Sequence, residues 1–111
     1  MLKYEFYRNE IGIPQFSIKG ELEGLNELGS CDNSYLNEIV TFLEQVINGQ
    51  MSKYEFGYEV YTIECSKDVS YVIDTFNEWK TIAEISTQEM FELMRDWRDY
   101  LIEWESQNDV K

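Results

Sequence analysis

The strongest constraint on the fold is a run of apolar residues near the C-terminus that repeats every three or four positions. This spacing predicts an amphipathic helix over residues 85–106. Ser86 at the N-cap and Glu89 three positions later form a capping box, and Ile85 and Met90 occupy the hydrophobic-staple positions around it. We expect most of the stripe to pack on a sheet and its last tryptophan to be left for a partner. The stripe consists of Met90, Met94, Trp97, Leu101 and Trp104.

The N-terminal half of the chain predicts a hairpin followed by a helix. Polar and apolar residues alternate over residues 2–7 and again over 14–20, with turn residues between them, which is typical of two half-buried strands. Apolar residues then recur at helical spacing from Leu36 to Ile47. Asn33 or Ser34 can cap this helix at its N-terminus, and Gly49 lies at the position after the C-terminus where helices commonly have a glycine in the left-handed backbone conformation.

Aromatic and β-branched residues dominate the region between the two predicted helices. Residues 53–65 and 69–76 therefore predict two paired strands, with a turn at 66–68 and a bulge or gap at Gly57. The pattern leaves open whether residues 77–83 add a further strand. We predict one α+β domain over residues 1–111, with an antiparallel sheet of four to five strands packed against two amphipathic helices in the order ββαββ(β)α.

The charge of the chain limits its partners. The formal net charge is −13, from 22 acidic and 9 basic residues, and residues 20–48 contain six acids and no base. Such a field repels nucleic acid and anionic membranes and attracts cationic partners. Two interpretations remain open, namely a solvated surface that keeps the protein soluble and a surface that binds a basic protein.

The residues that most enzymes need are missing. The chain has no His, which excludes Ser–His and Cys–His nucleophile arrangements, and Cys31 and Cys65 form no metal-binding pair. No phosphate-binding glycine motif and no calcium loop is present. We therefore expect no enzyme activity, no cofactor and no metal. Two isolated cysteines without a signal-peptide pattern suggest free thiols in the cytoplasm.

What remains is surface chemistry, in which carboxylates attract a basic partner and aromatic residues anchor it. The first candidate group lies in the acidic connection and the start of the first helix, and the second lies around Gly57. The predicted partner-binding residues of the first group are Glu21, Glu23, Glu27, Asp32, Tyr35 and Glu38, and those of the second are Tyr54, Glu55, Tyr58 and Glu59.

Three stretches together have a familiar order: KYEFYR at the start, YEVYTIECSKDVSYVID in the middle and ISTQEMFELMRDWRDYL near the end. Over most of its length, the chain resembles the small immunity proteins of bacterial contact-dependent growth inhibition and related polymorphic toxin systems. The resemblance implies a cytoplasmic protein that binds the toxin domain delivered by a neighbouring cell and blocks its active site. Such toxins are often cationic nucleases that act on RNA or DNA. The resemblance implies no fixed binding residues.

We accordingly expect a monomer that forms a 1:1 complex with a cognate, basic toxin domain and contacts neither nucleic acid nor membrane directly. Two alternatives belong to other classes. One is a self-associating structural or regulatory subunit sealed by the stripe around Trp97, Tyr100 and Trp104. The other is a DNA mimic that antagonises a nucleic-acid-binding protein.

Overall fold

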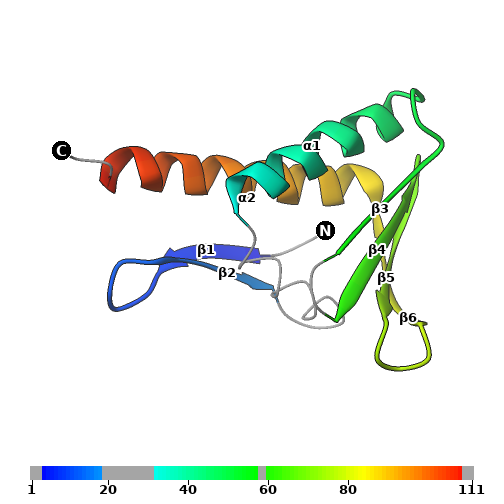
Figure 1. Ribbon diagram of the computed structural model, residues 1–111, viewed down its shortest axis with the longest axis horizontal. Helices are drawn as coiled ribbons and strands as arrows, with labels where there is room; N and C mark the ends of the chain where they lie inside the picture. The colour runs from blue at the N-terminus through cyan, green and yellow to red at the C-terminus, as the bar shows by residue number, and fades with distance from the viewer. Residues whose placement is uncertain (1–3, 19–31, 58–59, 109–111) are drawn as a thin grey trace.

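The computed structural model describes residues 4–18, 32–57 and 60–108. Over these residues it has two helices and six strands, and the strands form two antiparallel sheets of two and four strands; the element order is ββαββββα (Figure 1). The α+β class and the antiparallel pairing are confirmed. The strands form two separate sheets, whereas a single sheet of four to five strands was predicted.

The N-terminal hairpin pairs β1 (Tyr4–Arg8) with β2 (Pro14–Ile18). Its turn is closed by the side chain of Asn9, whose Oδ1 accepts hydrogen bonds at 3.0 Å from the backbone N–H groups of Ile11 and Ile13. Gly12 supplies a φ of 84°, which a residue with a Cβ adopts only with strain. One face of β2 is buried through Phe16 and Ile18, as the alternation predicted.

Helix α1 (Asn33–Ile47) has the predicted span and ends as predicted, but a different residue caps it. The N-cap is Asp32, whose Oδ1 accepts a 2.9 Å hydrogen bond from the backbone N–H of Tyr35. At the C-terminus Gly49 has a φ of 81°, and its N–H and that of Gln50 bond back to the last helical turn, which is a Schellman motif.

The larger sheet has the order β3-β4-β5-β6, formed by β3 (Lys53–Gly57), β4 (Tyr61–Ser66), β5 (Val69–Asp74) and β6 (Lys80–Ser86). Residues 53–65 are therefore two strands, and the predicted single strand is wrong. A Cβ on Gly57 would lie 2.4 Å from the carbonyl oxygen of Tyr61, so glycine permits β4 to pass close to the end of β3. A further strand does follow β5, but it covers residues 80–86.

Helix α2 (Thr87–Asn108) follows β6 directly. The predicted cap is confirmed, since the Glu89 N–H donates to Ser86 Oγ at 3.1 Å and Ser86 Oγ donates to Glu89 Oε1 at 3.1 Å. Ile85 belongs to the strand, so the helix begins two residues later than the apolar pattern alone indicates. No helix among the described residues is long and apolar enough to cross a membrane.

The core lies where the two helices meet each other and both sheets. Trp97 has no exposed surface, and its ring lies 5.3 Å from the ring of Phe6 and 5.6 Å from that of Phe16, measured between centroids. The last tryptophan of the stripe, Trp104, is half-buried, and its Nε1 donates a 2.8 Å hydrogen bond to the carbonyl of Gly12. Both helices and the hairpin lie on one side of the larger sheet (Figure 1). The opposite side of that sheet is left uncovered by these elements.

Candidate partner-binding surface

The pleat of the larger sheet separates two sets of side chains. Ile63, Cys65 and Val72 are buried on the side of the helices, whereas their neighbours along the strands point to the other face. The register places Glu55 opposite Glu64, Glu64 opposite Tyr71, and Tyr71 opposite Glu84. These four side chains therefore form one row across all four strands. We call this row, Glu55, Glu64, Tyr71 and Glu84, the outer acidic row.

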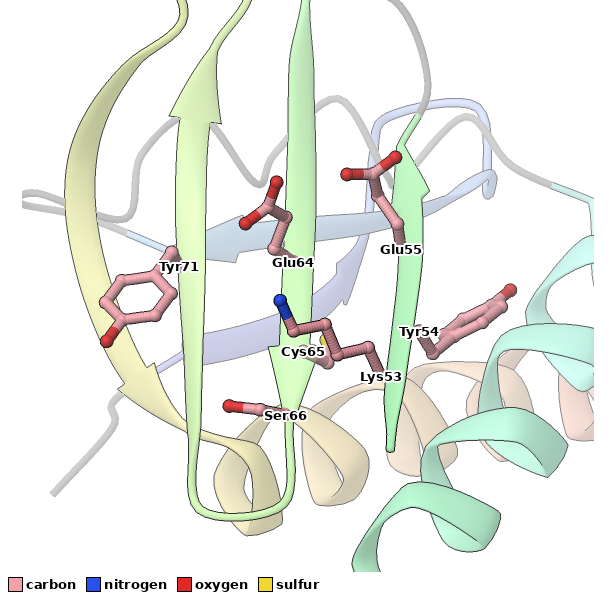
Figure 2. A pocket seen from close by; sticks show the side chains of 7 residues that line it. All are labelled: Lys53, Tyr54, Glu55, Glu64, Cys65, Ser66 and Tyr71. Carbon is pink, nitrogen blue, oxygen red and sulfur yellow. The ribbon is translucent and has the colours of Figure 1, made fainter. Parts of the chain in front are cut away.

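A hollow of about 390 Å³ lies at one end of the outer acidic row. Figure 2 shows Glu55 and Glu64 side by side on β3 and β4, with Lys53 and Tyr71 near them. The lining of the hollow places the carboxylates of Glu55 and Glu64 near the ring of Tyr71, with Lys53 as the one basic residue of the lining, and carboxylates beside an aromatic ring suit a cationic side chain. Its lining residues are Lys53, Tyr54, Glu55, Glu64, Cys65, Ser66 and Tyr71.

The outer acidic row opposes the stability of the sheet. Like charges directly opposite each other on neighbouring strands are destabilising, and Glu55 and Glu64 are such a pair. Both are exposed, as is Glu84, and within residues 4–18, 32–57 and 60–108 none of the three carboxylates forms an ion pair. With Lys53 as the basic residue beside Glu55 and Glu64, the outer acidic row still gives this face a net negative charge.

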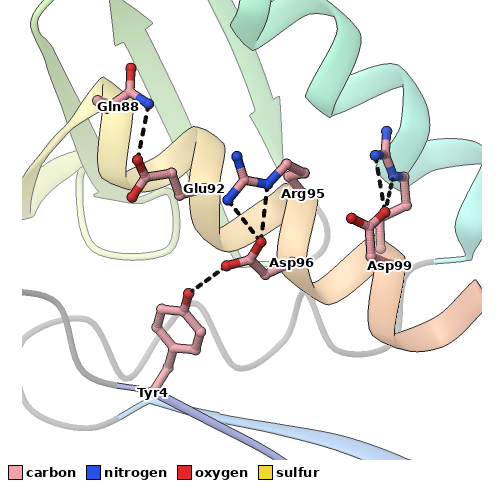
Figure 3. A network of polar contacts seen from close by, with 7 residues as sticks. Tyr4, Gln88, Glu92, Arg95, Asp96 and Asp99 are labelled. Atoms are coloured by element: carbon pink, nitrogen blue, oxygen red, sulfur yellow. Dashed lines mark hydrogen bonds and ion pairs between the residues drawn. The ribbon is translucent and has the colours of Figure 1, made fainter. Parts of the chain in front are cut away.

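The exposed side of α2 differs from this face because its basic residues are already paired. Arg95 lies 3.0 Å from Asp96, and Arg98 lies 3.0 Å from Asp99 (Figure 3). The Tyr4 hydroxyl donates a 3.0 Å hydrogen bond to Asp96. The pKa of Tyr4 is raised, mainly by burial and to a lesser degree by the Asp96 carboxylate. The carboxylates Asp96 and Asp99 are therefore partly neutralised by contacts within the fold.

The structure gives the residues of the first predicted group different roles. Asp32 caps α1, and Tyr35 is half-buried, with its hydroxyl donating to the Gly57 carbonyl at 2.5 Å and accepting from the Gly57 N–H at 3.1 Å. Both side chains are thus used by the fold, Tyr35 by joining α1 to the end of β3. Glu38 is exposed on α1. Glu21, Glu23 and Glu27 lie outside the described residues, and their role stays a prediction.

The second predicted group is divided by the pleat. Tyr54 points toward α1, where its ring stacks on Phe42 at 5.1 Å and on Phe56 at 5.8 Å (Figure 2). Burial raises the pKa of Tyr54, with a smaller effect of the nearby Tyr35, Glu38 and Cys65. Glu55 points to the opposite face and belongs to the outer acidic row.

The remaining two residues of that group, Tyr58 and Glu59, lie outside the described residues. The structure instead adds residues that were not predicted: Glu64, Tyr71 and Glu84. Their alternation with buried neighbours is visible in the sequence. Their alignment with Glu55 depends on the register of three strand pairs. One of these, the β3–β4 pair, was not predicted, because residues 53–65 were interpreted as a single strand.

Two features of the described residues bear on metal binding and on thiol chemistry. No group of three His, Cys, Asp or Glu residues there is arranged to hold a metal ion. Cys65 is a free thiol whose pKa is raised by burial to about 11, so it is protonated at neutral pH and a poor nucleophile.

Comparisons of the chain with protein-family models, with curated proteins and with solved structures gave no match.

Proposed function

We propose that this chain is an immunity protein that binds a basic nuclease toxin domain through the outer face of its larger sheet and blocks the active site of that domain. The observation that carries the proposal is the outer acidic row, in which three exposed carboxylates without ion-pair partners among the described residues flank Tyr71. The protein acts in the cytoplasm as a monomer and forms a 1:1 complex. Inhibition is steric and electrostatic, without a reaction.

The electrostatic argument follows from what a nuclease must hold. A groove that binds nucleic acid is lined with Lys and Arg that contact phosphates, so its field is positive. Glu55 and Glu64 lie on adjacent strands about 5 Å apart, so their charges act together on a cationic side chain of such a groove. With a net charge of −13, the chain is also attracted to such a groove over long range, which raises the rate of association.

The hollow beside the row supplies a specific contact. An Arg or Lys side chain of the toxin entering it meets the carboxylates of Glu55 and Glu64 and the ring of Tyr71. Such a contact relieves the repulsion between the two carboxylates, which exists only while the surface is empty. Binding therefore compensates for a feature that weakens the free protein.

The acidic connection that was predicted as a binding site remains compatible with this proposal, because the toxin contacts of Glu21, Glu23 and Glu27 stay a prediction. A homodimer sealed by the stripe of α2 has less support. Trp97 is fully buried inside the chain, and Trp104 is bonded to Gly12.

Bacterial survival tests the proposal. The genes that flank this one are searched for a toxin domain; that flanking toxin domain is expressed together with the chain, and growth is compared with expression of the toxin alone. We expect the wild type to protect the cells and the double variant Glu64→Lys, Glu84→Lys to protect them poorly. Glu5→Lys is the matched control, because Glu5 is an exposed strand residue of the other sheet and lies opposite the neutral Ser17.

Two outcomes would contradict the proposal. One is the absence of a flanking toxin gene, or toxicity that the wild-type chain leaves unchanged. The other is full protection by the double variant at wild-type protein levels, which would remove the outer acidic row from the binding surface while leaving the immunity role in place.

A further inference from the structure

The turn between β5 and β6, residues 75–79, exposes two large aromatic side chains. Phe76 is 79% exposed and Trp79 is 64% exposed. Figure 1 shows this turn projecting from the end of the larger sheet, away from both helices. Neither ring takes part in a ring–ring contact or in the core cluster among the described residues. The fold gains little from either side chain.

The backbone of this turn adopts a conformation that its residues disfavour. Glu78 and Trp79 have φ values of 57° and 58°, and the Lys80 N–H bonds to the Asn77 carbonyl at 3.2 Å. Two central residues with positive φ are the mark of a type I′ hairpin turn, for which Asn-Gly is the favoured pair. Glu-Trp takes this conformation only with strain, and such strain concentrates at binding and catalytic sites.

The turn is nevertheless held in place. The Phe76 N–H donates to Asp74 Oδ1 at 3.0 Å, and Thr75 bonds to the Val60 carbonyl through both its N–H at 3.0 Å and its hydroxyl at 2.6 Å. The aromatic side chains are thus presented by an ordered backbone. A presentation of this kind lowers the entropy that binding would otherwise cost.

The charge of the chain decides which partner the turn fits. A second copy of the chain carries the same net charge of −13, so the two copies repel each other, and an anionic membrane repels the chain for the same reason. A basic protein is attracted. Trp79 directly precedes β6 and Glu84 lies five residues further along the chain, so they lie roughly 17 Å from each other at most, and a standard interface of about 800 Å² on each partner covers both.

We propose that Phe76 and Trp79 form an aromatic anchor that enters an apolar pocket on the same basic toxin domain that the outer acidic row contacts. This inference rests on the proposed function and adds to it a second contact of a different kind. The outer acidic row steers association, whereas the aromatic anchor slows dissociation. Tryptophan in particular is enriched among the residues that dominate binding energy.

The test uses the flanking toxin domain as the probe and measures association and dissociation rates at two salt concentrations. Trp79→Gly removes the side chain and relieves the strain, so its unfolding midpoint should rise while its affinity falls. We expect Kd to increase about 30-fold or more, mostly through faster dissociation, with an unchanged salt dependence. Phe76→Ala should act in the same direction.

Ile11→Ala is the matched control, because Ile11 is 78% exposed at the turn of the other hairpin. Its Kd should equal that of the wild type. If Trp79→Gly and Phe76→Ala bind like the wild type while Glu64→Lys binds poorly, the aromatic anchor is refuted and the proposed function stands. If the wild-type chain itself fails to bind the toxin domain, both proposals are overturned.

Discussion

Replacing Glu64 by Lys should make the protein more stable although it removes a residue of the proposed binding surface. Glu64 lies directly opposite Glu55 in the β3–β4 pair, and neither carboxylate has an ion-pair partner among the described residues. The substitution exchanges a repulsive cross-strand pair for an attractive one. It changes nothing in the core, because the Glu64 side chain is exposed.

The size of the gain follows from this geometry. A favourable or unfavourable charge pair at directly opposed strand positions contributes roughly 0.2 to 1 kcal/mol. Removing the repulsion and adding an attraction should therefore raise the free energy of unfolding by about 1 kcal/mol. For a domain of this length, that corresponds to an increase of about 4 °C in the unfolding midpoint.

Thermal unfolding followed by circular dichroism measures the effect at roughly 0.01 M and about 1 M salt. The gain should be largest at low salt and should shrink at high salt, where the screening length falls from about 30 Å to about 3 Å. Glu5→Lys again serves as the control, since it changes the net charge equally but faces the neutral Ser17. If both variants gain the same stability, the argument from the Glu55–Glu64 pair is wrong.

Three further predictions concern contacts inside the fold. Tyr35→Phe leaves the partly buried N–H and carbonyl of Gly57 without their partner and should lower the free energy of unfolding by about 1 kcal/mol, measured in urea; an unchanged midpoint would contradict this role. Ser86→Ala removes the cap of α2 and should lower the free energy of unfolding by about 1 kcal/mol in the same assay, whereas Ser86→Thr keeps the capping oxygen and should retain most of the wild-type stability. Burial raises the pKa of Cys65 from 9.0 to about 11, so its contribution to stability is intact below about pH 9 and falls by roughly 2 kcal/mol as the pH rises to 11. Cys65→Ala should show a correspondingly shallower loss of stability over this range, and equal slopes would refute the assignment.

Local signals in the sequence predicted the C-terminal end of α1, the N-cap of α2 and the first hairpin. The capping box at Ser86 and the left-handed Gly49 are short-range features, each completed within a few residues of the chain. The alternation in residues 14–20 correctly predicted which side of β2 is buried, including Phe16 and Ile18. Such features depend on neighbours in the sequence, so they can be recognised without the fold.

The candidate surface, in contrast, depends on contacts between residues that are far apart in the sequence. The partner of the Tyr35 hydroxyl is a backbone group 22 residues away, and nothing near Tyr35 marks it. The shift of β6 to residues 80–86 follows from a turn at Glu78 and Trp79 that contains no glycine to indicate it. The outer acidic row requires the register of three strand pairs, and register follows from packing of the whole sheet.

The most direct test of the account is the rate of association between this chain and the flanking toxin domain as salt is varied. We predict that the double variant Glu55→Lys, Glu64→Lys associates about tenfold or more slowly than the wild type at low salt and shows a weaker salt dependence. Association at the wild-type rate, with the wild-type salt dependence, would contradict the claim that the outer face of the larger sheet meets a basic partner.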